Sequence, residues 1–81
     1  MKTEEVLIIT MEECGELVQA CSKVMRSGGK KKYLRNLVEE IGDVYLMLDL
    51  LKKHGYYTDE DIYNRQQLKR DKLKKWSNIN V

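Results

Sequence analysis

Apolar and polar positions follow a helical spacing along most of the chain, and two turn signals divide the pattern into three segments. In residues 3–26 apolar side chains recur every three or four positions, which is typical of a helix with one buried face. The residues that carry this spacing are Val6, Ile9, Leu17, Ala20 and Val24. Ser27, Gly28 and Gly29 then predict the end of this helix. Residues 30–32, all lysines, are expected to continue the loop.

A second helix is predicted over residues 33–53. Its apolar positions are Leu34, Leu37, Val38, Ile41, Val44, Leu48 and Leu51. From Val44 to Leu51 the segment is apolar on nearly every side except at Asp49. A helix buried on all sides in a chain of 81 residues requires a partner chain. His54 and Gly55 predict its end.

The third helix is predicted over residues 58–76, with Thr58 as its N-cap and three acidic residues in its first turn. The short connection before it predicts that this helix lies antiparallel to the second. No segment has the alternation of a β-strand over a useful length. The pattern therefore predicts an all-α chain with a single domain over residues 1–81.

Two acidic clusters interrupt the apolar seams of the first two helices. Glu12-Glu13-Cys14-Gly15-Glu16-Leu17 and Glu39-Glu40-Ile41-Gly42-Asp43-Val44 share one pattern and lie 27 residues apart. On a helical wheel Glu13 and Glu16 are about 60° apart and lie among apolar side chains, and Glu40 and Asp43 have the same spacing. Four carboxylates are therefore expected to point toward the place where the two helices meet.

Four like charges in an apolar seam need compensation, because even one desolvated ion costs several kcal/mol. Protonation with raised pKa values is one solution, and a bound cation is the other. Oxygen ligands suit a hard divalent cation, Mg²⁺ or Mn²⁺. Iron is disfavoured because Glu13, Glu16 and Glu40 lack a histidine three positions on. A solvated polar stripe is the alternative, and Glu12 and Glu39, at the edges of the seams, could be solvated or reach the site.

The glycines within the clusters fit the same interpretation. Each costs about 1 kcal/mol relative to alanine inside a helix. Gly15 and Gly42 each precede an inner acid, where a small residue lets a helix or a ligand approach closely. A tight helix crossing is the alternative reason for a glycine at either position.

Charge and cysteine content narrow the expected binding partners and cellular location of the protein. The net charge is +2, and residues 64–81 hold six basic residues and one acidic residue, so a basic segment follows an acidic body. This balance suits an anion held through metal ions and makes nucleic acid an unlikely partner. Cys14 and Cys21 are about 10.5 Å apart along a helix, too far for a disulfide, which fits the cytoplasm. The sequence shows neither a signal peptide nor a membrane span.

The acidic pattern resembles the signature of the MazG-like nucleoside triphosphate pyrophosphohydrolases, an all-α family. That signature is Glu-Glu-x-x-Glu, a gap, and Glu-x-x-Asp. Here it reads Glu12-Glu13-Cys14-Gly15-Glu16, then 23 residues, then Glu40-Ile41-Gly42-Asp43. The resemblance spans the first two predicted helices. It implies Mg²⁺-dependent hydrolysis of the α–β linkage of an NTP or dNTP, which releases the monophosphate and pyrophosphate.

The resemblance also assigns roles to residues. The metal ligands that it implies are Glu13, Glu16, Glu40 and Asp43. It marks Glu12 and Glu16 as catalytic, with Glu12 a candidate to orient or deprotonate the attacking water. Phosphate-binding residues would follow on the third helix, where the chain offers Asn64, Lys69, Lys72 and Lys75. Homodimers or homotetramers are implied too, in which helices of two subunits form four-helix bundles.

Two other functions are compatible with the sequence. One is a nucleotide or metal sensor that uses the same scaffold without catalysis. The other is a helical interaction module that binds nucleic acid or an acidic protein through its basic third helix. The acidic seam favours the enzyme and the sensor over the interaction module.

Overall fold

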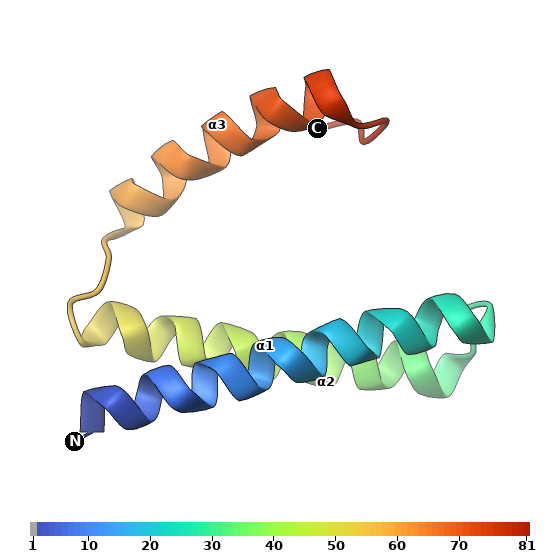
Figure 1. Ribbon diagram of the computed structural model, residues 1–81, viewed down its shortest axis with the longest axis horizontal. Coiled ribbons are helices and arrows are strands. Elements are labelled where there is room, and N and C mark those ends of the chain that lie inside the picture. Colours follow the sequence, from blue (N-terminus) through green and yellow to red (C-terminus); the bar gives the residue numbers. More distant parts are fainter. Residues whose placement is uncertain (1) are drawn as a thin grey trace.

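The computed structural model describes the backbone of residues 2–81 and the side chains of residues 4–81. This part of the chain forms three helices and no strand: α1 (Lys2–Ser27), α2 (Lys31–Lys53) and α3 (Asp59–Trp76) (Figure 1). The predicted all-α class is confirmed, and the helix limits differ from the predicted ones by one or two residues. Lys31 and Lys32 are a correction, because they open α2 and do not continue the loop. Lysine is a good helix former, so the helix extends back to the extended residue Lys30.

The turn between α1 and α2 has the predicted glycine stop. Gly28 and Gly29 have φ values of 70° and 84°, in the left-handed region that glycine adopts without strain. The Gly29 N–H donates to the Val24 carbonyl at 3.0 Å and so closes the last turn of α1. The chain then reverses, and α1 and α2 form an antiparallel hairpin in which the two helices lie side by side (Figure 1).

The seam of this hairpin contains the most enclosed apolar side chains. Ala20 of α1 and Met47 of α2 are 1% and 7% exposed, and among the described residues they alone are buried. Their neighbours along the seam, such as Ile9, Leu17 and Leu50, are half-buried. One chain therefore encloses only a thin line of apolar side chains between its two long helices.

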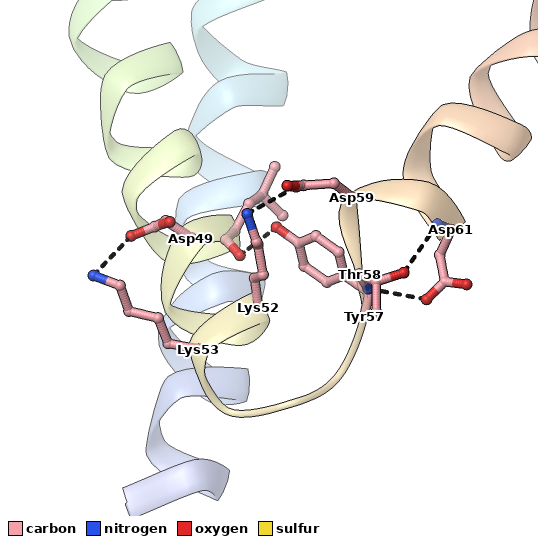
Figure 2. Close-up of polar contacts among 8 residues, drawn as sticks. Asp49, Lys52, Lys53, Tyr57, Thr58, Asp59 and Asp61 are labelled. Carbon is pink, nitrogen blue, oxygen red and sulfur yellow. Dashed lines mark hydrogen bonds and ion pairs between the residues drawn. The ribbon is translucent and has the colours of Figure 1, made fainter.

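The turn into α3 is held by polar contacts (Figure 2). Lys52 Nζ lies 2.8 Å from Asp59 Oδ1, and the Tyr57 hydroxyl donates to the Leu48 carbonyl at 2.6 Å. Thr58 caps α3 as predicted: its Oγ1 accepts from the Asp61 N–H at 3.1 Å, and its own N–H donates to Asp61 Oδ2 at 2.9 Å. These contacts fix the start of α3.

Beyond this turn α3 diverges from the hairpin (Figure 1). As predicted, α3 runs back in the direction opposite to α2 (Figure 1), but in the described part of the chain its backbone closely approaches neither α1 nor α2. The helix is strongly polar and has no buried residue. It therefore lacks the apolar stripe that would hold it against α2.

A single chain exposes far more surface than a compact protein of its size. Its accessible surface is 6741 Å², whereas a compact chain of this mass exposes about 5,100 Å². The radius of gyration is 15.1 Å, against about 12 Å for a compact domain of this length. The fold leaves apolar surface that no other part of the described chain covers.

Much of that surface forms one apolar face of the hairpin. Eleven exposed residues with 3–4 spacing make up this apolar face: Leu7, Met11, Cys14, Val18, Cys21 and Met25 from α1, and Leu34, Val38, Ile41, Tyr45 and Leu48 from α2. Each α2 member stands 27 positions after an α1 member. In an antiparallel pair, equivalent positions are related by a local two-fold axis, so both stripes lie on the same face. Val18 and Val38 are 70% and 68% exposed.

Candidate metal centre

The 27-residue offset brings the two acidic clusters together at the middle of the hairpin. Carboxylate oxygens of Glu13 from α1 and of Glu40 and Asp43 from α2 all lie within 4.8 Å of one another. Glu16 lies beside them, since it interacts directly with both Glu13 and Glu40. We call Glu13, Glu16, Glu40 and Asp43 the acid cluster.

Two carboxylates of the acid cluster are partly buried in the seam. Glu13 and Glu40 are half-buried, and the Oε2 atom of each is enclosed and accepts no hydrogen bond from the described residues. A buried oxygen that accepts no hydrogen bond has lost its hydration without a compensating contact, and this destabilises the folded state. Glu16 and Asp43 remain exposed and form the open side of the cluster.

The arrangement raises the pKa of both half-buried carboxyl groups above the ordinary value. Burial is the largest cause of the raised pKa of Glu13, followed by the charges of Glu16, Asp43 and Glu12. Burial also comes first for the pKa of Glu40, followed by hydrogen bonding to Glu16 and by the charges of Glu16, Asp43 and Glu13. Each cause disfavours the ionised form, so the acids oppose one another when all are charged.

The described chain supplies no cation to offset this repulsion directly. Its ion pairs join Lys52 to Asp59 and Lys53 to Asp49, at the far end of α2, and no lysine or arginine pairs with the acid cluster. A structural salt-bridge network therefore does not account for the acids.

A hard divalent cation fits the donor set. Oxygens on opposite sides of a Mg²⁺ ion are about 4.2 Å apart, since each bond is about 2.1 Å. The separation of at most 4.8 Å among Glu13, Glu40 and Asp43 needs only small side-chain adjustments to reach this geometry. The enclosed Oε2 atoms of Glu13 and Glu40 are free to bind a cation, and such binding would satisfy them.

The two outer acids differ from the cluster. Glu12 and Glu39 are both exposed. Glu12 is close enough for its charge to raise the pKa of Glu13. Its carboxylate therefore stands at the edge of the cluster, whereas Glu39 has no described contact with it.

The predicted phosphate-binding residues lie elsewhere. Asn64, Lys69, Lys72 and Lys75 are exposed on α3, which diverges from the hairpin. One chain does not bring them to the acid cluster. Only a second chain could supply these side chains to the site.

Other polar residues, which the sequence analysis did not single out, lie next to the cluster. Glu16 and Glu40 line a cavity of about 280 Å³ together with Gln19, Lys23 and Asn36. Their spacing was the available signal: Lys23 follows Glu16 by two helical turns, and Asn36 precedes Glu40 by one. Each therefore shares a helix face with an inner acid.

The two helical glycines have no close neighbour in one chain. A Cβ atom added at Gly15 or Gly42 would meet nothing within 4 Å. A tight crossing between α1 and α2 is therefore not the reason for either glycine. Both border the apolar face, so any close approach that they permit must come from outside the chain.

Comparison with known proteins adds no assignment. No protein-family model, curated protein or solved structure matches the chain. The MazG-like resemblance therefore stays a prediction that rests on the acidic motif. No helix in the described part of the chain is long and apolar enough to cross a membrane, and the described cysteines, Cys14 and Cys21, are free and exposed.

Removing one acid should have opposite effects with and without metal. In chelator, Glu40→Gln should raise the melting temperature, because it removes a half-buried charge that its neighbours repel. Saturating Mn²⁺ should stabilise the wild-type protein by about 2.7 kcal/mol at 100 times its Kd, and the variant far less. Differential scanning calorimetry with and without Mn²⁺ measures both effects. Glu39→Gln removes the same charge from the exposed neighbouring residue. It should change neither the melting temperature in chelator nor the stabilisation by Mn²⁺.

The raised pKa values also predict how stability depends on pH. Between pH 4.5 and the raised folded pKa of Glu40, the folded protein binds more protons than the unfolded chain, so stability falls as pH rises. In chelator, the stability advantage of Glu40→Gln over wild type should therefore be larger at pH 7.5 than at pH 5. Chemical denaturation at the two pH values measures this difference. An advantage that is equal at both values would contradict the repulsion.

Proposed function

We propose that the protein is a Mg²⁺-dependent nucleotide pyrophosphohydrolase, which cleaves an NTP or dNTP to the monophosphate and pyrophosphate. The observation that carries the proposal is the pair of enclosed, undonated carboxylate oxygens of Glu13 and Glu40 beside Asp43. Such an arrangement does not stabilise a fold, whereas a site that holds a divalent cation for phosphate chemistry uses free carboxylate oxygens as ligands. The MazG-like pattern of the same residues supports this choice of reaction.

The reaction that we propose is a substitution at the α-phosphorus. The oxygen of a water molecule bonds to the α-phosphorus, and the bond from that phosphorus to the α–β bridging oxygen breaks. The bridging oxygen keeps the electron pair and leaves with pyrophosphate, while the water proton passes to a carboxylate. A bound divalent cation would neutralise phosphate charge and lower the pKa of the water.

The acids would divide this work by position. Glu13, Glu40 and Asp43 would hold the cation, because their oxygens converge. Glu16 is exposed beside them and would complete the ligand set and act in catalysis. Glu12, at the edge of the cluster, would orient or deprotonate the attacking water. Asn64, Lys69 and Lys72 would contribute to substrate binding only from the α3 of a second chain.

We also propose that two copies of the chain pair through their apolar faces. The surface in excess of a compact chain is about 1,600 Å², roughly twice the 800 Å² that each partner buries in an interface of standard size. Two hairpins joined in this way would form a four-helix bundle, with the acid clusters on its outer sides. A tetramer would pair two such dimers. The proposed setting is the cytoplasm, where Cys14 and Cys21 would remain thiols.

Activity tests the reaction directly. Incubation with a panel of NTPs and dNTPs and Mg²⁺ should release pyrophosphate, measured by a coupled phosphate assay with pyrophosphatase. Glu16→Gln and Asp43→Asn should each lower the rate by about 100-fold or more, the scale for loss of one electrostatic group in an active site. Asp71→Asn on α3 should match wild type.

Two other outcomes separate the alternatives. Stabilisation by Mg²⁺-nucleotide without turnover of any nucleotide would support a sensor. Salt-sensitive binding of nucleic acid that Glu16→Gln does not affect would support the interaction module and contradict the pyrophosphohydrolase.

Pairing through the apolar face predicts that one buried charge disrupts the assembly. Val18→Glu should convert the dimer to monomer, because it places an unpaired carboxylate at the centre of the interface. Gln19→Glu adds the same charge on the polar side of α1 and should leave the dimer intact. Analytical ultracentrifugation gives the mass of each. A wild-type protein that is monomeric at 100 times its assay concentration would contradict the pairing.

A further inference from the structure

Three hollows follow one another along the seam of the hairpin, and together with the acid cluster we call them the groove. On one side of the cluster is an apolar cavity of about 410 Å³, lined by Glu5, Val6, Ile9, Met47 and Leu50. On the other side is the cavity of about 280 Å³ that Gln19, Lys23 and Asn36 share with the acids. A third cavity of about 290 Å³ follows, which we call the basic pocket, lined by Lys23, Arg26, Ser27, Lys30 and Tyr33.

These parts are consecutive along the helices. Ile9 precedes Glu13 by about one turn, and Met47 follows Asp43 by about one turn, so the apolar cavity adjoins the cluster. Glu16 and Glu40 belong to the next cavity, and Lys23 belongs to that cavity and to the basic pocket. The groove therefore changes in order from apolar to acidic to amide-lined to basic.

We propose that this order sets the direction of the nucleotide: the base lies toward the apolar cavity, and the pyrophosphate portion extends toward Lys23, on the side of the basic pocket. The proposal rests on the proposed function, because it takes a nucleoside triphosphate as the ligand. The α-phosphate then lies at the acid cluster, where the bond to the leaving group breaks.

The chemistry of each part favours this direction. Among the described residues none that lines the basic pocket is acidic, and Lys23, Arg26 and Lys30 place three positive charges around it. Pyrophosphate gains negative charge as it leaves, so Lys23 would stabilise the leaving group and the positive charge of the basic pocket would attract it. The amide groups of Gln19 and Asn36 can donate hydrogen bonds to phosphate oxygens on the way.

The reverse direction is unfavourable at both ends. It would place phosphates among Val6, Ile9 and Met47, beside the carboxylate of Glu5 and with no cation from the described residues in the lining. It would leave the charges of the basic pocket without an anion. Tyr33, the aromatic residue of that pocket, would be the only feature to favour a base there.

Lys23 is the residue that connects the two polar cavities. It follows Glu16 by about 10.5 Å along α1, and its side chain leans back toward the N-terminus of the helix and so toward the cluster. It is exposed and has no ion pair with the described residues, so the fold does not depend on its charge. We therefore assign Lys23 as the residue that binds the leaving group.

Binding of the two products to the Mn²⁺-loaded protein tests the direction without turnover. In isothermal titration calorimetry, Lys23→Gln should lower the affinity for inorganic pyrophosphate by about tenfold or more, which is the scale for the loss of one charge-assisted hydrogen bond. The affinity of this variant for nucleoside monophosphates should stay within about twofold of the wild-type affinity. Lys23→Arg should restore most of the pyrophosphate affinity. Lys74→Gln, an equal change on α3 at an exposed lysine outside the proposed substrate-binding set, should match wild type, and Mn²⁺ affinity should be the same in all variants.

The outcomes separate this proposal from the proposed function. Loss of pyrophosphate binding in Lys23→Gln supports the direction even if no nucleotide is hydrolysed. Hydrolysis with pyrophosphate affinity unchanged in Lys23→Gln overturns the direction and leaves the function in place. Weaker monophosphate binding with unchanged pyrophosphate binding means that the base lies at the Tyr33 end, and it overturns the proposal as well. A wild-type protein that does not bind pyrophosphate overturns it too.

Discussion

Mutual repulsion among carboxylates in a helical seam is the constraint on which the rest of this structure depends. The hairpin of α1 and α2 places Glu13 and Glu40 between apolar side chains, with an oxygen of each enclosed and without a donor. An apolar residue at either position would pack better and cost nothing electrostatically. The sequence instead repeats the acids 27 residues apart on both helices. The proposed site, in which a bound cation would hold an anion such as a triphosphate, would explain this repetition.

The same 27-residue offset gives the hairpin two different faces. Positions on one side of both helices are apolar and exposed, and positions on the other side form the groove with the acid cluster. A chain that buries only Ala20 and Met47 among its described residues has little core of its own. Association of two apolar faces would supply a core and leave the groove open to solvent. Stability and function would then use opposite faces of one hairpin.

Local chemistry made most of the fold predictable. Left-handed glycines at 28 and 29 and the cap at Thr58 mark helix ends through contacts within a few residues, so the limits agree within two positions. The convergence of the acids followed from their i, i+3 spacing in apolar stripes. Lys31 and Lys32 were assigned to the loop wrongly, because charge alone does not distinguish a loop from the first turn of a helix.

Features that depend on tertiary arrangement were not predictable. The short turn was expected to set α3 antiparallel to α2, and α3 does run back, but the polar α3 has no stripe to bury and diverges from the hairpin beyond the contacts at Tyr57 and Lys52. The predicted phosphate-binding residues were placed on α3 because of the resemblance to the MazG-like family. Lys23 and Asn36 lie instead beside the acids, and only the pairing of α1 with α2 makes them neighbours.

The most direct test is a crystal structure of the protein soaked in saturating Mn²⁺, with anomalous diffraction measured for manganese. The account predicts an anomalous peak bound by oxygens of Glu13, Glu40 and Asp43. Acid side chains that point apart into solvent, with no manganese peak between the two helices, would contradict it.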